Sequence, residues 1–212
     1  MKKGLTVFAA VLLVAALVPQ PAAAKVTFNL GVKAGVSLSN ISWSDDDGQE
    51  KSIIRPTFGV LGAVHLSPMF AVQAELNYVT VGEWWEDTES VDVWKIVENF
   101  GYLQIPVLLK VRLMPESKVA PFLSAGPFLG ILLSAHEKEY LNGELTDDFE
   151  WKSYFKSTDF GAAFGGGAEF MVSKLKVFVD LRFNMGLTNV YTYLTKYSMK
   201  TRALVLTGGI LF

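Results

Sequence analysis

Residues Arg202–Phe212 read RALVLTGGILF, an alternation that ends on an aromatic side chain. One parity of this stretch is apolar except at Gly208 and comprises Leu204, Leu206, Ile210 and Phe212. Successive side chains of a β-strand point to opposite faces, so the stretch predicts a strand with one apolar face. A strand that closes a barrel against the first strand would account for an exposed aromatic residue at this position.

Seven earlier stretches alternate in the same way. They cover residues 28–38, 58–66, 70–78, 103–113, 119–133, 160–170 and 177–187. Their length of about 10 to 14 residues suits a tilted strand that crosses hydrocarbon and exceeds the 5 or 6 residues usual in globular proteins. The sequence therefore predicts eight strands of membrane-spanning length.

The connections between these stretches alternate between short and long. Tight turns are expected near residues 67–69, 114–118 and 172–174, and long polar loops at 40–55, 81–99, 135–157 and 189–200. This is the arrangement of an outer-membrane barrel, with short periplasmic turns and long outer loops. The predicted fold is all-β: a single eight-stranded antiparallel up-and-down transmembrane β-barrel with both termini in the periplasm.

Aromatic residues of the apolar parity gather at the strand ends, as the two interfacial girdles of such a barrel require. Those expected at the inner ends are Phe28, Phe70, Phe170 and Phe212, and those at the outer ends are Phe58, Tyr78 and Phe160.

The first 24 residues have the composition of a cleaved signal peptide. Lys2 and Lys3 precede an apolar run over Leu5–Val18, and three alanines precede Lys25. A membrane anchor is the alternative, but the run is shorter than the ~20 residues that span a bilayer. We expect residues 1–24 to be a signal peptide, residues 25–212 to be one barrel domain, and the protein to lie in the outer membrane of a Gram-negative bacterium.

The composition excludes several classes of function. The 212-residue chain has no Cys, so it has neither disulfides nor thiolate metal sites. Its formal charge of −2 becomes more negative without Lys2 and Lys3, which argues against nucleic acid as a partner. No cofactor or metal motif occurs, and the run Asp45–Asp47 lacks the spacing of a calcium loop.

The parity opposite the apolar one supplies the barrel interior. An eight-stranded barrel is only wide enough for side chains to fill it, so we expect a hydrogen-bonded plug of paired charges, with a small conducting path as the weaker alternative. The charged residues assigned to this polar network are Lys33, Glu75, Lys110, Arg112, Glu169, Asp180 and Arg182.

The predicted outer loops are acidic and hold every tryptophan. As candidates for binding a surface protein or glycan we take Trp43, Trp84, Trp85, Trp94 and Trp151. They could equally pack the loops together or rest at the membrane interface. A catalytic alternative would use His136 with the nearby Ser134, but no nucleophile elbow accompanies them.

Four segments resemble the porin-family outer-membrane β-barrels of Bacteroidota type, a group that includes PorT-like proteins. They are Gly31–Gly35, Tyr102–Lys110, Pro121–Pro127 and Gly208–Phe212. The resemblance implies the barrel fold over the mature chain, contact with outer-membrane lipid and lipopolysaccharide, and insertion by the outer-membrane assembly machinery, with Phe212 as part of its signal. Pro106 lies within such a segment and predicts a bulge or kink, because proline cannot donate to the ladder.

The predicted function is that of a monomeric, non-enzymatic outer-membrane barrel with a structural or surface-binding role. One alternative is a small porin or a PorT-like component of protein secretion. Another is a soluble, periplasmic, lipocalin-like barrel that holds a lipid, in which the apolar parity would point inward and the charged parity outward.

Overall fold

The computed structural model describes residues 27–43, 51–87, 92–173, 175–192 and 198–212. The predicted signal peptide and Asp45–Asp47 lie outside these described residues. The strands are β1 (Thr27–Trp43), β2 (Lys51–His65), β3 (Phe70–Asp87), β4 (Trp94–Arg112), β5 (Val119–Leu141), β6 (Glu144–Glu150), β7 (Thr158–Val172), β8 (Leu175–Gly186) and β9 (Met199–Leu211), with a short 3-10 turn, η1 (Lys152–Tyr154).

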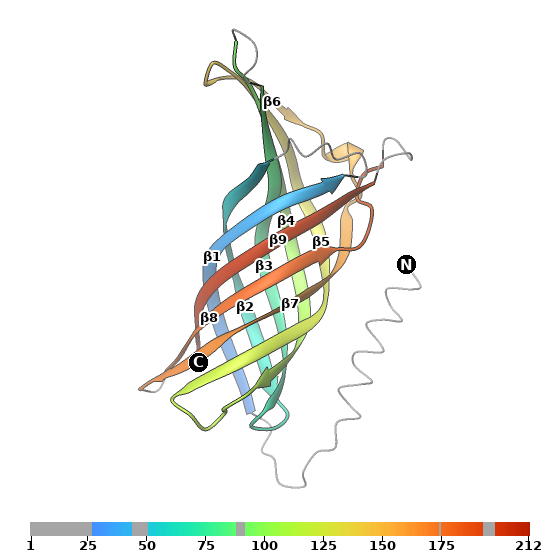
Figure 1. Cartoon of the computed structure of the whole chain (residues 1–212). Helices are drawn as coiled ribbons and strands as arrows, with labels where there is room; N and C mark the ends of the chain where they lie inside the picture. The colour runs from blue at the N-terminus through green and yellow to red at the C-terminus, as the bar shows by residue number, and fades with distance from the viewer. Residues whose placement is uncertain (1–26, 44–50, 88–91, 174, 193–197) are drawn as a thin grey trace.

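Eight of these strands form a closed antiparallel barrel (Figure 1). Neighbours in the chain pair with each other, with β5 followed by β7 in the ring, and β9 returns to pair with β1 from Gly31 opposite Leu211 to Trp43 opposite Met199. β6 stands outside the ring and pairs with β5 alone. The predicted eight-stranded barrel is therefore confirmed. The described residues contain no helix long and apolar enough to cross a membrane.

The two parities of the strands face in the predicted directions. On β1, the side chains of Leu30 and Val32 are 56% and 47% exposed. Lys33 and Ser37, on the opposite parity of the same strand, are 7% and 0% exposed. A soluble calyx would bury the apolar parity, so this burial pattern excludes the lipocalin-like alternative. Phe28, Phe58 and Phe212 are each more than half exposed on the outward parity. Phe28 and Phe212 lie at the ends of β1 and β9, whereas Phe58 lies in the middle of β2, which extends beyond the predicted strand.

β9 ends one residue earlier than the predicted strand, at Leu211, but the backbone of Phe212 continues the ladder. Its N–H donates to the carbonyl oxygen of Leu30 at 2.7 Å, and the side chain of Asn29 donates to the carbonyl oxygen of Phe212 at 2.8 Å. These bonds join the last residue of the chain to the first barrel strand.

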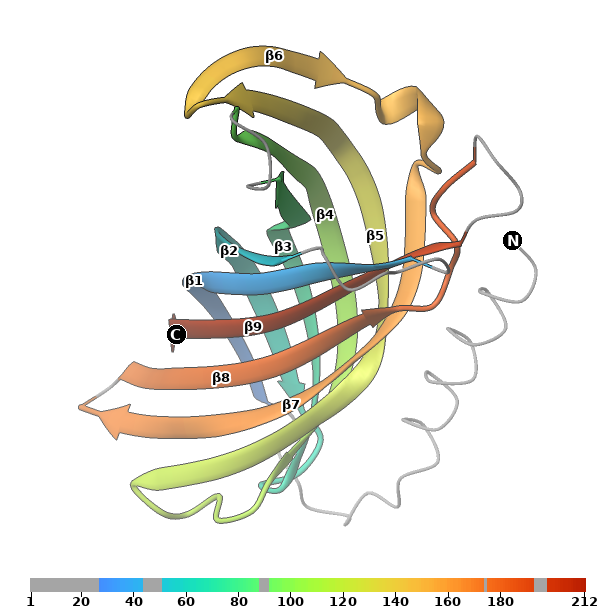
Figure 2. The same ribbon diagram turned by 45° about the horizontal axis from the view of Figure 1, so that its top comes forward.

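Three of the predicted loops are wrong over most of their described length: all described residues of the first, 40–43 and 51–55, belong to β1 and β2. β3 continues to Asp87, β4 begins at Trp94, and β5 continues to Leu141 and turns back as β6. These segments form a sheet that rises above the barrel (Figures 1 and 2). We call it the outer wall, and it comprises residues 81–87, 94–100, 135–141 and 144–150. The two faces of the outer wall do not differ as the lipid-facing and interior faces of a membrane strand do. The alternation of apolar and polar residues is therefore lost in the wall, although its strands remain paired through their backbones.

The turn between β5 and β6 has the backbone conformation that a tight hairpin needs. Asn142 and Gly143 both have positive φ, at 52° and 86°. An Asn-Gly pair is the strongest local signal for such a turn, because both central residues must adopt left-handed conformations. This signal was present in the sequence at the centre of a predicted loop.

The bulge expected at Pro106 is absent. Its register with β5 is the same on both sides of the proline, from Ile105 opposite Leu129 to Leu109 opposite Ala125. The shift in register lies instead between Gly101 and Tyr102. This shift lies near the level where the barrel ends and the outer wall begins. A β-bulge bends its strand, so the shift fits a change of curvature at that level.

Candidate functional site

The half of the barrel interior nearer the short turns is organised around one carboxylate. Glu75 accepts hydrogen bonds from Lys33 Nζ at 2.6 Å and from two nitrogens of Arg182 at 2.9 and 3.1 Å. The side chains of Gln73 and Asn77 donate to the same carboxylate at 2.6 and 2.8 Å. Arg182 also pairs with Asp180. Three strands, β1, β3 and β8, thus meet at a carboxylate whose side chain is fully buried.

A second ion pair lies beside the first. Lys110 Nζ is 2.6 Å from Glu169 Oε1, and Arg112 lies 3.8 Å from the other oxygen of Glu169. Lys110 Nζ also donates to the amide oxygen Oε1 of Gln73 at 3.4 Å, and Gln73 donates to Glu75, which links the two groups. All seven charged residues assigned to the lumen from the sequence therefore lie in one connected polar network, held by β1, β3, β4, β7 and β8.

This polar network leaves almost no free volume. The space between Lys33, Asn77, Asp180 and Arg182 is about 10 Å³, no more than one water molecule occupies. Two smaller apolar clusters pack in the same interior, namely Leu61, Phe178 and Leu211, and Leu108, Phe128 and Ala163. Buried charges are tolerated when they are paired. Every charged residue of this network has an oppositely charged partner, although Arg112 Nε, Asp180 Oδ1 and Arg182 Nε have no hydrogen-bond partner among the described residues.

The half of the interior nearer the long loops is apolar, so the polar network fills only part of the lumen. Its buried cluster, here called the apolar cap, comprises Ile41, Val79, Val81, Phe100, Tyr102, Leu132, Ala135, Phe155, Val190, Met199, Ala203 and Val205. Phe155 and Val190 come from the connections rather than from barrel strands, so no strand alternation could have revealed their part in the cap.

Aromatic contacts fix the segment around η1 to the barrel mouth. The Phe155 ring lies 4.9 Å from Phe100 and 5.2 Å from Trp151, both edge to face, and 5.7 Å from Tyr191. A bridge joins the backbones of Phe155 and Tyr191. The third and fourth outer connections are therefore anchored, through Phe155 and Val190, to apolar residues of the barrel strands.

Asp159 marks the border between the polar network and the apolar cap. It is 1% exposed, and its carboxylate accepts hydrogen bonds from Thr188 at 2.6 Å and Thr201 at 2.5 Å. These bonds satisfy the buried acid and connect β7 to β9 beyond the end of β8, which lies between them in the ring.

The outer wall has two chemically different faces. The inward face carries a row of acids, in which Glu98 lies opposite both Glu83 and Glu137. Glu83 accepts a hydrogen bond from the backbone of Ile41 at 3.2 Å. Beyond the membrane-spanning part of β5, burial and the nearby charges of Glu139 and Asp147 raise the pKa of Glu137. Like charges directly opposite one another weaken a sheet, so this row lowers the stability of the wall.

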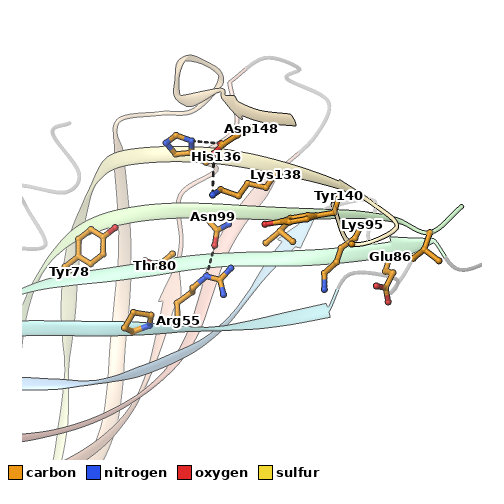
Figure 3. A pocket seen from close by; sticks show the side chains of 14 residues that line it. Arg55, Tyr78, Thr80, Glu86, Lys95, Asn99, His136, Lys138, Tyr140 and Asp148 are labelled. Atoms are coloured by element: carbon orange, nitrogen blue, oxygen red, sulfur yellow. Dashed lines mark hydrogen bonds and ion pairs between the residues drawn. The ribbon is translucent and has the colours of Figure 1, made fainter. Parts of the chain in front are cut away.

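The outward face of the wall is hollowed and carries cations (Figure 3). A cavity of about 880 Å³ spans β2 to β6. Its charged lining comprises Arg55, Glu86, Lys95, His136, Lys138 and Asp148. His136 and Lys138 lie 3.0 and 3.4 Å from the carboxylate of Asp148, and the hydrogen bond with His136 lowers the pKa of Asp148.

The tryptophans proposed as binding residues occupy different environments. Trp151 packs against the apolar cap, and Trp43 ends β1 opposite Met199. Trp84 lies on the outward face of the wall, with the ammonium groups of Lys51 and Lys95 at 4.5 and 4.2 Å from its ring. Trp94 begins β4 and is 39% exposed, and Trp85, its near neighbour on β3, has the opposite parity to Trp84. The five therefore do not form one patch.

The described side chains provide no metal site, since no three His, Asp or Glu residues gather around a common point within the described ranges. The ring of His136 is hydrogen-bonded to Asp148 rather than to Ser134, although both Ser134 and His136 lie on β5. The catalytic alternative thus has a histidine oriented by a carboxylate but no hydrogen bond between that histidine and the serine.

The geometry is that of a small outer-membrane β-barrel: a closed ring of eight long strands with an apolar exterior, a filled interior and short turns at one end. Residues 20–192 match the model of the outer membrane protein beta-barrel domain, and the chain belongs to that family. The protein therefore resides in the outer membrane, with the wall on the extracellular side.

Solved structures of small outer-membrane proteins share this fold. Neisserial surface protein A is 15% identical, with a TM-score of 0.50, and the match covers 88% of this chain and 97% of that one. OprG from Pseudomonas aeruginosa is 11% identical, also with a TM-score of 0.50, over 89% and 98%. Ail, the attachment invasion locus protein of Yersinia pestis, is 14% identical, with a TM-score of 0.43, over 87% and 98%. No curated protein shows significant similarity to the chain.

Proposed function

We propose that this protein is a closed, non-enzymatic outer-membrane barrel that carries the outer wall as a binding surface. The observation that carries the proposal is the filling of the interior at two levels by two kinds of chemistry, paired charges on the periplasmic side and the apolar cap on the extracellular side. A barrel with both levels filled offers ions no continuous path. The strands of the wall, by contrast, extend far beyond what membrane crossing requires.

Planar-bilayer conductance of the refolded mature protein tests this closure. We expect no discrete channels, with heat-modifiable gel migration as the control for folding. The double variant Glu75→Ala/Phe155→Ala removes a central contact at each level and should admit ions, whereas either single variant leaves one level closed. Discrete channels from the unaltered protein would overturn the proposal and favour the small-porin alternative.

Three finer assignments belong to the same proposal. Residues 1–24 are a cleaved signal peptide, residues 25–212 are the mature barrel, and the protein acts as a monomer. Phe212 forms part of the signal read by the assembly machinery, an assignment supported by its exposed ring at the end of the closing strand. Deletion of Phe212 should reduce the fraction of protein inserted in the outer membrane, while Phe212→Tyr, which keeps an aromatic ring, should insert normally.

A PorT-like role in secretion is the second candidate, supported by the sequence resemblance. The filled lumen argues that such a role would use the outer wall as a docking surface rather than the barrel as a conduit. Loss of the wall hairpin, residues 142–150, would then abolish secretion without affecting insertion. A binding role for a surface protein or glycan predicts the same variant to lose its ligand instead.

A further inference from the structure

The cavity on the outward face of the outer wall begins where the lipid-facing surface of the barrel ends. Phe58 and Tyr78 stack on that surface, with ring centroids 5.3 Å apart, at the extracellular ends of the predicted membrane strands. Tyr78 also lines the cavity, as do Pro56 and Thr80 beside it. Because girdle aromatics lie at the level of lipid headgroups, the cavity is open to the headgroup layer of the outer leaflet.

The cations of this cavity are held in place by their neighbours. Arg55 donates through Nε to Asn99 Oδ1 at 2.8 Å, from a stretch of β2 where the register with β3 shifts. Lys95 lies over the ring of Trp84, whose other cationic neighbour is Lys51. Lys138 contacts Asp148 but keeps 37% of its side chain exposed. Cations fixed before a ligand arrives lose less conformational entropy when it binds.

The distribution of charge on the wall favours an anionic ligand on this face. Glu83, Glu98 and Glu137 point to the inward face, whereas Arg55, Lys95 and Lys138 line the outward cavity with only Glu86 and Asp148 as acids. The whole chain has a formal charge of −2. The hollow holds three cations and two acids and continues the lipid-facing surface at Tyr78, so it favours an anionic ligand that approaches along that surface.

We propose that this hollow binds the phosphorylated headgroup of a glycolipid in the outer leaflet. Its cations match phosphate, which lysine and arginine recognise through charge-assisted hydrogen bonds. Tyr78, Tyr140, Thr80 and Asn99 add the aromatic and hydrogen-bonding groups that a sugar requires. A volume of about 880 Å³ accommodates a sugar phosphate rather than a single inorganic ion. The acyl chains would continue down the exposed apolar surface that includes Phe58 and Val60.

The test uses the folded mature protein in phosphatidylcholine vesicles that contain a small fraction of a bisphosphorylated diglucosamine lipid. Retention of this lipid after transfer to nanodiscs is measured by native mass spectrometry. The variant Lys95→Gln/Lys138→Gln removes two charges from the hollow. Attraction of anionic lipid is worth a factor of about five per basic residue, so we expect about a 25-fold loss of affinity, with less of a loss at high salt.

The matched control is Lys200→Gln/Arg202→Gln. These two substitutions remove the same charge as the test variant. They do so at exposed, outward positions of β9, on a part of the barrel that does not line the cavity. The affinity of this control variant for the glycolipid should stay within about twofold of that of the unaltered protein. An equal loss in both variants would reduce the effect to general surface charge and overturn the proposed site.

Two further arms identify the ligand. The dephosphorylated glycolipid should bind the unaltered protein and the Lys95→Gln/Lys138→Gln variant equally weakly. The reason is that the phosphates make the contacts that distinguish the two proteins. Free glucosamine phosphate should compete only at concentrations far above that of the lipid. Equal retention of the two glycolipids, or competition by the soluble sugar phosphate at matching concentration, would contradict a lipid headgroup as the occupant.

Discussion

The periplasmic and extracellular halves of the interior are closed by opposite chemistry. The polar network around Glu75 consists of side chains from five barrel strands. The apolar cap consists partly of strand residues and partly of Phe155 and Val190 from the outer connections. The network holds strands to one another, whereas the cap holds loops to strands.

This difference follows from what each half must stabilise. In the membrane, the backbone ladder is already closed, and the interior must only be filled without leaving a charge unpaired. At the extracellular mouth, long connections need an anchor, and burial of aromatic rings supplies it without any requirement for exact polar geometry. Damage to the network should therefore weaken the whole barrel, and damage to the cap should release mainly the loops.

Glu75→Ala is the change that should have the largest effect. It leaves Lys33 without its ion-pair partner and Arg182 with Asp180 alone. Removal of one member of a buried ion pair costs about 3–5 kcal/mol, and we expect a loss of that size in the free energy of unfolding measured with urea in vesicles. The double variant Lys33→Met/Glu75→Ala removes the orphaned cation and should recover much of the loss. A loss below about 1 kcal/mol in the single variant would show that the network does not hold the barrel together.

Phe155→Ala should have a smaller and more local effect. The ring is 5% exposed and contacts three other aromatic side chains, so its removal should cost about 3 kcal/mol in the apolar cap. Because Phe155 lies outside the barrel strands, we expect faster amide exchange around η1 and residues 189–192, with unchanged exchange on β3 around Glu75. Faster exchange throughout β3 would mean that the two halves unfold as one unit.

The barrel half of this comparison was accessible from the sequence. Alternation from Phe28 onward predicted which face of each strand is exposed, because lipid outside and charges inside impose opposite preferences on neighbouring residues. The same pattern assigned Lys33, Glu75 and Arg182 to the interior, where the structure brings them together. Their pairing could not be predicted, since it depends on strand tilt and register around the ring.

The apolar cap and the outer wall were missed for different reasons. Phe155 and Val190 lie in irregular connections, where periodicity gives no information about burial. The wall consists of true strands, but residues 81–87 and 135–141 mix apolar and charged side chains on each parity, so no consistent apolar parity identifies them. Asn142-Gly143 was the one local signal that could have revealed the β5–β6 hairpin.

Glu137→Gln should strengthen the outer wall relative to the barrel. The raised pKa of Glu137 means that its protonated form suits the folded wall, so its favourable contribution is present at low pH and is lost as the pH rises through the folded value. At neutral pH the amide removes repulsion from Glu98, Glu139 and Asp147, and we expect a gain of about 0.2–1 kcal/mol in the local stability of β5 and β6, measured by amide exchange.

Glu144→Gln is the matched control for this gain. Glu144 is an exposed residue of β6 opposite Leu141, so the same change of charge should leave amide exchange of the wall nearly unaltered. Equal gains in both variants would attribute the effect to the net charge of the wall rather than to the row of acids on its inward face.

Asp148→Asn should have the smallest effect and the opposite dependence on pH. The hydrogen bond with His136 and the contact with Lys138 lower the pKa of Asp148, so the ionised carboxylate favours the paired hairpin. This contribution is present above the ordinary aspartate pKa of about 4 and is lost as the pH falls through the lower folded value. Acid should therefore weaken β6 pairing through Asp148 while it strengthens the wall through Glu137.

The two variants separate these opposed contributions. In NMR spectra recorded in detergent from pH 7 to pH 3, the amide signals of β6 in Glu137→Gln should report only the loss of pairing in acid. Those of Asp148→Asn should report only the gain. Since Asp148 is exposed and its pairing is screened by salt, the loss should shrink at high ionic strength, whereas the gain from the partly buried Glu137 should persist. The same acid response in both variants would show that the two faces of the wall do not titrate independently.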